Sequence, residues 1–125
     1  MKLLNEYLTY INEQESEPTI GVDLDGTLAR YDGYKGPDHI GEPIEIMMSR
    51  VKHWITEGKK VVIFTARATD PNAIPPIKKW LLDNGLPDLK ITCVKDPSMK
   101  VIYDDRAVQV EKNTGKILSN IETFL

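Results

Sequence analysis

Residues 19–27 read TIGVDLDGT, a short and largely apolar run that leads directly into two aspartates, a glycine and a threonine. Its β-branched and apolar positions predict a strand covered on both faces, as in a parallel sheet. Strands and helices are expected to alternate after it, because β-prone segments alternate with segments whose apolar side chains recur every three or four residues. The strands are expected at 60–64, 90–94 and 101–103, and the helices at 44–57 and within 74–84. This alternation predicts an α/β fold with a three-layer, Rossmann-like open sheet that is mainly parallel.

The remaining segments predict smaller elements around that sheet. An amphipathic helix is expected over 3–14, and a loop or small hairpin over 30–43, which is rich in glycine and proline. Residues 107–110 are a candidate fifth strand, and 117–125 a candidate terminal helix. There is no internal repeat, so residues 1–125 are expected to form a single domain.

Composition excludes several classes of protein. The chain has 125 residues, of which 41% are hydrophobic and 28% charged, which is ordinary globular usage. No apolar run approaches the roughly 20 residues of a membrane helix, and the single cysteine allows no intrachain disulfide. We therefore expect a cytoplasmic protein without a membrane partner. The net charge of −3 gives no overall attraction to nucleic acid, so a phosphate-handling site has to carry its own positive charge.

Polar or charged side chains follow all four expected strands. In open α/β sheets, ligands bind beyond the carboxyl ends of the strands, so these side chains are candidates for one shared site. They are Asp23, Asp25, Thr65, Arg67, Lys95, Asp104 and Asp105. Carboxylates are suited to holding a hard cation such as Mg²⁺, and the basic side chains to holding an anion.

The two aspartates at 23 and 25 leave a strand on the same side, because side chains alternate along it. They cannot both stay ionised at close range without a compensating cation. The motif taken alone is also compatible with a simple turn, since Asp, Gly and Thr all favour turns. A calcium loop of the EF-hand type is excluded, because its twelfth position requires glutamate and here is Tyr34. The occurrence of polar residues at four strand ends together favours a functional site.

The sequence resembles the haloacid dehalogenase (HAD) superfamily of phosphohydrolases. Residues 22–28 (VDLDGTL) are similar to its first motif and residues 64–67 (FTAR) to its second. Lys95 matches the third-motif lysine, with Lys100 as a rival, and residues 103–105 (YDD) match the fourth-motif acid pair. The matches span residues 20–105. Residues 104–106 (DDR) also resemble, locally, the phosphatase domains of phage-type polynucleotide kinases.

The resemblance implies a Mg²⁺-dependent phosphatase that hydrolyses a phosphomonoester through an aspartyl-phosphate. Asp23 would be the nucleophile, and Asp25 the general acid and then the base that activates water. The metal would be held by Asp23, the carbonyl of Asp25, and Asp104 or Asp105.

The resemblance also implies how the phosphate is held. Thr65 and Lys95 would hold the non-bridging phosphate oxygens. Gly26 and Thr27 would bind substrate through their backbone N–H groups. Arg67 has two interpretations, either a substrate contact or one half of a structural ion pair. Arg106 is expected to be structural, and His39 to lie exposed in the 30–43 loop.

Neither interval between these motifs has room for a cap domain of the kind many family members carry. We therefore expect an open site that admits bulky substrates such as a nucleic-acid end or a phosphoprotein. Nucleic acid is expected only as a substrate; the class of phosphorylated substrate and the oligomeric state stay open. The alternatives are phosphate transfer to an acceptor other than water, a nucleic-acid end phosphatase, and a non-catalytic phosphate- or metal-binding module with the same fold.

Overall fold

The computed structural model describes residues 3–6 and 17–119. Residues 3–6 are helical, in agreement with the start of the helix predicted over 3–14, and the rest of that helix lies outside the described residues. Across both described ranges, none of the helices has the length and apolar character that a membrane crossing requires.

Four strands form one parallel sheet, which confirms the predicted open α/β fold. They are β1 (Thr19–Val22), β2 (Lys60–Phe64), β3 (Ile91–Thr92) and β4 (Met99–Tyr103), in the order β3-β2-β1-β4. Val22 lies opposite Ile63 of β2 and Tyr103 of β4, so the three longest strands reach the same level at their carboxyl ends. Side chains that follow β1, β2 and β4 therefore meet at one edge of the sheet.

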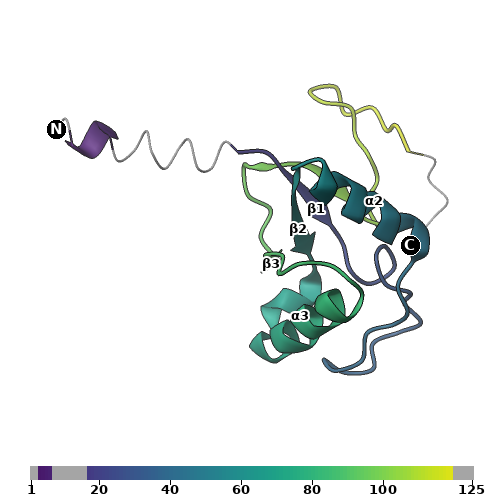
Figure 1. The fold of residues 1–125 in the computed structure, drawn as a ribbon. Coiled ribbons are helices and arrows are strands. Elements are labelled where there is room, and N and C mark those ends of the chain that lie inside the picture. Colours follow the sequence, from purple (N-terminus) through teal and green to yellow (C-terminus); the bar gives the residue numbers. More distant parts are fainter. Residues whose placement is uncertain (1–2, 7–16, 120–125) are drawn as a thin grey trace.

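The two long helices lie on the same face of this sheet. Helix α2 (Glu45–Thr56) joins β1 to β2, and α3 (Ile74–Asp83) joins β2 to β3 (Figure 1). Both connections step in the same direction across the sheet, and right-handed crossovers then place their helices on one side. One buried cluster accordingly joins both helices to the strands. Its largest side chains are Val22, Leu24, Leu28, Met48, Val51, Ile63, Ile77 and Leu81.

The opposite face differs from the expected three layers. Neither α2 nor α3 covers it, and the connection from β3 to β4 over residues 93–98 contains no helix. On that face the Met99 side chain packs directly over Gly21, where there is no room for a larger residue. Within residues 17–119 the sheet thus has one helical layer.

Two predictions for the end of the chain are corrected. Residues 107–110 do not form a fifth strand of the sheet; Val110 makes only an isolated antiparallel bridge with Ile117. Asn113 and Gly115 adopt positive φ angles of 67° and 80°, and they turn the chain so that this bridge can form. The helix predicted over 117–125 is absent from residues 117–119, and 120–125 lie outside the described residues.

Residues 30–43, here called the flap, form a loop closed at its base. The Arg30 amide donates to the Glu42 carbonyl over 2.8 Å, and Ala29 bridges Pro43 in antiparallel fashion. Between β1 and β2 the chain forms only a turn, the flap and α2. Between β2 and β3 it forms two short 3-10 helices and α3. Neither of these fully described intervals contains a cap domain, as expected.

Candidate functional site

A tight turn after β1 positions the first acidic residues. The Asp23 amide donates to the Tyr103 carbonyl over 2.9 Å, which fixes residue 23 against the end of β4. The Leu24 carbonyl then accepts from the amides of Leu28 (3.0 Å) and Ala29 (2.9 Å). Gly26 has a φ of +89° and lies against the Asp105 carboxylate, so a side chain at position 26 would be strained and would collide with that group. The turn therefore brings the 23–27 backbone close to the acids after β4.

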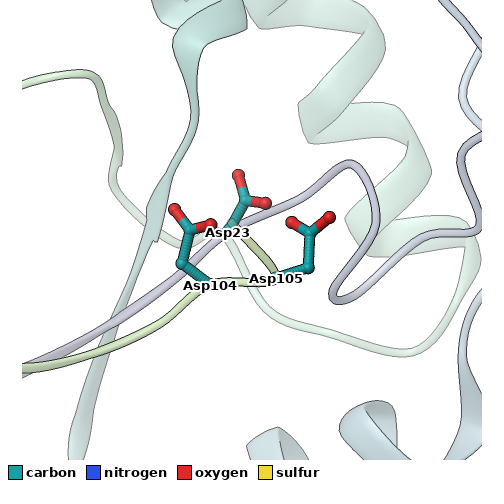
Figure 2. Close-up of side chains that lie close together, drawn as sticks. All are labelled: Asp23, Asp104 and Asp105. Atoms are coloured by element: carbon teal, nitrogen blue, oxygen red, sulfur yellow. The ribbon is translucent and has the colours of Figure 1, made fainter. Parts of the chain in front are cut away.

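Three carboxylates converge at this point. One oxygen from each of Asp23, Asp104 and Asp105 lies within 4.8 Å of the others. Figure 2 shows that these side chains extend from the ends of β1 and β4 and point toward the same space. The Thr27 hydroxyl lies 3.4 Å from Asp23 Oδ2 and 3.4 Å from Asp105 Oδ1, and it accepts from the Asp105 amide over 3.1 Å. Thr27 thus links the two halves of the cluster.

Asp23 is the most perturbed of these acids. It is 7% exposed. Burial, a hydrogen bond with Asp105 and the negative charges of Asp104 and Asp105 raise the pKa of the Asp23 carboxyl to about 7. A cluster of carboxylate oxygens with this excess of negative charge matches the ligand preference of Mg²⁺, a hard cation that takes oxygen donors. The donor set thus fits the metal that the sequence predicts.

Asp25 does not join this cluster with its side chain. Its two oxygens accept from Arg67, Oδ2 from Nε over 2.7 Å and Oδ1 from Nη2 over 2.9 Å. The Asp25 side chain is 19% exposed and the Arg67 side chain 6%. Hydrogen bonding to Asp25 is the main cause that raises the pKa of the Arg67 guanidinium above its already high ordinary value. Of the two interpretations of Arg67, the structure contains the ion pair.

Arg67 also holds the flap. Its Nη2 donates to the His39 carbonyl over 2.9 Å and its Nη1 to the Gly36 carbonyl over 3.3 Å. Its guanidinium carbon lies 5.2 Å from the centroid of the Tyr34 ring, a cation–π distance. His39 therefore contributes its backbone to this arrangement, and Asp25 is connected to the flap through one arginine.

Thr65 follows β2 and is buried beside these groups. Its amide donates to the Thr92 carbonyl over 2.9 Å, and its hydroxyl oxygen accepts from the Arg67 amide over 3.2 Å. The hydroxyl caps the short 3-10 helix Ala66–Thr69, and its own proton stays available for an acceptor.

A cavity of about 330 Å³ lies over this edge of the sheet. It brings together five of the site residues predicted from sequence, which are Asp23, Asp25, Thr65, Arg67 and Asp105. Asp104 belongs to the acidic cluster at its base. The cavity is also lined by Arg106 and by two flap residues, Tyr31 and Tyr34.

The two candidate lysines are placed elsewhere. Lys95 is exposed and is not among the residues that line this cavity, and Lys100 lines a different cavity beside Trp54. The reason is the short connection after β3. Asp96 accepts from the Ser98 amide over 2.8 Å, and the Ser98 carbonyl accepts from Thr19 at the start of β1. By that point the chain has already returned to the amino edge of the sheet.

The backbone amides of Gly26 and Thr27 are also engaged. The Gly26 amide donates to Ala29 over 2.8 Å and the Thr27 amide to Leu24 over 3.3 Å. Both amides donate within the turn itself. Neither amide is therefore free for the anion-binding role that the sequence predicted.

Sequence reasoning treated Arg106 as structural and did not consider Tyr31 or Tyr34. Arg106 lines the cavity, its amide donates to Asp104 Oδ1 over 2.7 Å, and within the described ranges its guanidinium forms no ion pair. A signal for Arg106 was present, because it directly follows the acid pair at a strand end. The two tyrosines carry no comparable signal, since their approach depends on how the flap folds back.

Comparison with known proteins supports the fold. No protein-family model matches the chain. No curated protein matches it. A conserved protein from Bacteroides thetaiotaomicron has a similar structure, with a TM-score of 0.57 and 22% sequence identity over 72% of this chain and 77% of that one. At this identity the similarity supports the α/β architecture and carries no information on activity.

Proposed function

We propose that the protein is a Mg²⁺-dependent phosphohydrolase that cleaves a phosphomonoester with Asp23 as the nucleophile. One observation carries this proposal: a buried aspartate directly after the central strand β1 shares its space with the two acids that follow β4. A structural turn has no need of three converging carboxylates that destabilise one another. Such a cluster is useful where a cation and a phosphoryl group are brought together.

The metal would be held by carboxylate oxygens of Asp23, Asp104 and Asp105. When bound, it supplies positive charge that offsets the repulsion between the nucleophile and the phosphate and stabilises the charge of the transition state. The Thr27 hydroxyl, which contacts both Asp23 and Asp105, positions the two carboxylates.

In the first step the Asp23 carboxylate attacks phosphorus, the bond from phosphorus to the leaving oxygen breaks, and protonated Asp25 donates its proton to that oxygen as an aspartyl-phosphate forms. In the second step water attacks that phosphorus, which releases phosphate and restores the carboxylate. Asp25, which has given up its proton in the first step and lies beside Arg67, then accepts a proton from this water. The proton it takes up is the one that protonates the leaving oxygen of the next substrate.

The phosphate needs positive charge and hydrogen-bond donors in addition to the metal. Thr65 offers its hydroxyl from the end of β2, and Arg106 offers from the end of β4 a guanidinium that has no ion-pair partner among residues 3–6 and 17–119. Since Lys95 does not line the cavity, we propose Arg106 as the side chain that holds the non-bridging oxygens. A guanidinium presents a fork of donors that suits a phosphate group.

The test is release of inorganic phosphate from a panel of phosphomonoesters, with Mg²⁺ and with a chelator. We expect turnover that requires the metal and that is lost in Asp23→Asn. The matched control is Asp88→Asn, which changes an exposed aspartate that follows α3 and pairs with Lys78 of that helix. Full activity of Asp23→Asn would contradict the proposal.

A second candidate is a non-catalytic module that binds a divalent cation or phosphate. It is favoured by the ion pair, because both Asp25 oxygens are already bonded to Arg67 and a proton carrier has to release one of them. This candidate predicts that Mg²⁺ binds with no phosphate release from any member of the panel. Calorimetric titration with Mg²⁺, run beside the turnover assay, separates the two candidates.

A further inference from the structure

The flap places two aromatic rings at the mouth of the cavity that contains Asp23. Tyr31 and Tyr34 both line this cavity, and they are 46% and 57% exposed. Neither ring belongs to the buried core, so folding does not explain why two large aromatic residues lie here. Exposed tyrosines beside a polar cavity are typical of surfaces that bind a planar ligand.

The Tyr34 ring is held in place by the Arg67 guanidinium. The Arg67 guanidinium lies 5.2 Å from its centroid, and Arg67 is itself fixed by Asp25 and by the flap carbonyls of Gly36 and His39. A ring stacked on a fixed guanidinium is already oriented, so binding a second planar group on its exposed side costs little conformational entropy. Tyr34 thus offers a ready stacking surface.

The spacing of these groups points to a particular ligand. The Arg67 guanidinium contacts both Asp25 and the Tyr34 ring, so one side chain connects the aromatic surface to the acid–base carboxylate. A ligand that reaches both the acidic cluster and the ring needs a spacer between its phosphate and its planar group. A nucleoside monophosphate has this form, because a ribose separates the phosphate from the base. The cavity of about 330 Å³ is at the lower end of the volumes, roughly 300–1,000 Å³, that hold small ligands.

We propose that Tyr31 and Tyr34 form the base-binding part of the site, and that the phosphorylated substrate is a nucleoside monophosphate unit, either free or at the end of a strand. This inference rests on the proposed function, because it takes the phosphate to be held at the acidic cluster.

The test compares adenosine 5′-monophosphate with ribose 5-phosphate, which has the same phosphate and sugar but no base. In the presence of Mg²⁺, we expect the wild-type kcat/KM to be higher for the nucleotide. Tyr34→Ala should lower the ratio of the two kcat/KM values by roughly 10-fold, which is within the usual contribution of one base–aromatic stack. Tyr34→Phe keeps the ring and should keep the ratio. A ratio that is unchanged in Tyr34→Ala, or lost equally in Tyr34→Phe, would overturn the inference.

Two further measurements complete the test. One distinguishes a free nucleotide from the end of a strand, and the other distinguishes failure of this inference from failure of the proposed function. A short oligonucleotide with a terminal phosphate identifies the strand end as the source if its turnover exceeds that of the free nucleotide and falls in Tyr34→Ala. If the wild type hydrolyses nothing, calorimetry with the nucleotide and ribose 5-phosphate decides. Binding of the nucleotide that depends on Tyr34 keeps this inference and removes the proposed hydrolysis, whereas equal or absent binding of both removes the inference.

Discussion

Asp23 and Asp25 differ sharply in their electrostatic surroundings, although both follow the same strand. Asp23 is buried beside Asp104 and Asp105, and the negative charge around it raises its pKa to about 7. Asp25 has a cation on both of its oxygens. One carboxylate is left with an excess of negative charge, whereas the other is neutralised by the protein itself.

This difference in charge balance indicates a different role for each of the two aspartates. A group whose charge is balanced within the fold contributes to structure, and here the Asp25–Arg67 pair fixes the flap through Gly36 and His39. A group whose charge is unbalanced favours a ligand of opposite charge, and at Asp23 the divalent cation that we propose would supply that charge.

The largest effect is expected from Asp23→Asn. The amide removes the nucleophile, and we expect turnover to fall by on the order of 10⁶-fold, as when the nucleophile of another hydrolase is removed. Because the substitution also removes a repelled negative charge, the metal-free variant should be at least as stable as the wild type. Phosphate release and thermal unfolding, measured on the same preparation, check both statements. A variant that is inactive only because it is unfolded would contradict this account.

Breaking the Asp25–Arg67 ion pair should instead lower the stability of the protein. Arg67→Ala leaves the Asp25 carboxylate without its cation in a mostly buried position and releases two flap carbonyls, so we expect a loss of about 3 kcal/mol in the free energy of unfolding. Urea unfolding measures this loss. The double variant Arg67→Met, Asp25→Leu removes both charges and should recover much of it. No recovery would show that the flap contacts, and not the ion pair, account for the stability.

A smaller effect is expected when the positive charge of Arg106 in the cavity is removed. Arg106→Ala should raise KM for a phosphomonoester by roughly 10-fold, the usual loss of one charge-assisted hydrogen bond. Arg106→Lys should recover part of the affinity. Lys95→Ala is the matched comparison, because it removes an exposed cation that does not line the cavity. A larger loss in Lys95→Ala than in Arg106→Ala would reverse the assignment and favour the lysine that the family resemblance indicated.

The sequence was sufficient to predict the parallel sheet and the meeting of Asp23, Thr65 and the 104–105 acids at its carboxyl edge. The reason is physical: strand periodicity and the ends of apolar runs place a residue at an edge without any knowledge of side-chain contacts.

The sequence was insufficient where position depends on a loop or on the choice of a partner. Lys95 follows a strand, but β3 is only two residues long, and Lys95 lies exposed outside the cavity, directly before the return of the chain through Asp96 and Ser98. For Arg67 the sequence allowed either an acid or the substrate as the partner. The carbonyls that orient Arg67 toward Asp25 come from the flap, and their position depends on how the flap folds. Within residues 17–119 the second helical layer is missing for a related reason, because the crossover of residues 93–98 is too short to contain a helix.

The dependence of stability on pH provides the finest test of the contrast. In the metal-free protein the pKa of Asp23 is about 7, compared with 3.8 for an unperturbed aspartate, so between these values the folded state binds more protons than the unfolded state. The contribution of Asp23 to stability therefore falls as pH rises from about 4 to about 7. Asp96 has a lowered pKa because of its hydrogen bonds with Ser98, so its effect has the opposite sign and lies below this window.

Thermal unfolding across pH 4–8 should show the decline in the wild type and its absence in Asp23→Asn. Saturating Mg²⁺ should reduce the decline, because a cation that binds the ionised carboxylates restores stability at the pH values where their repulsion is greatest.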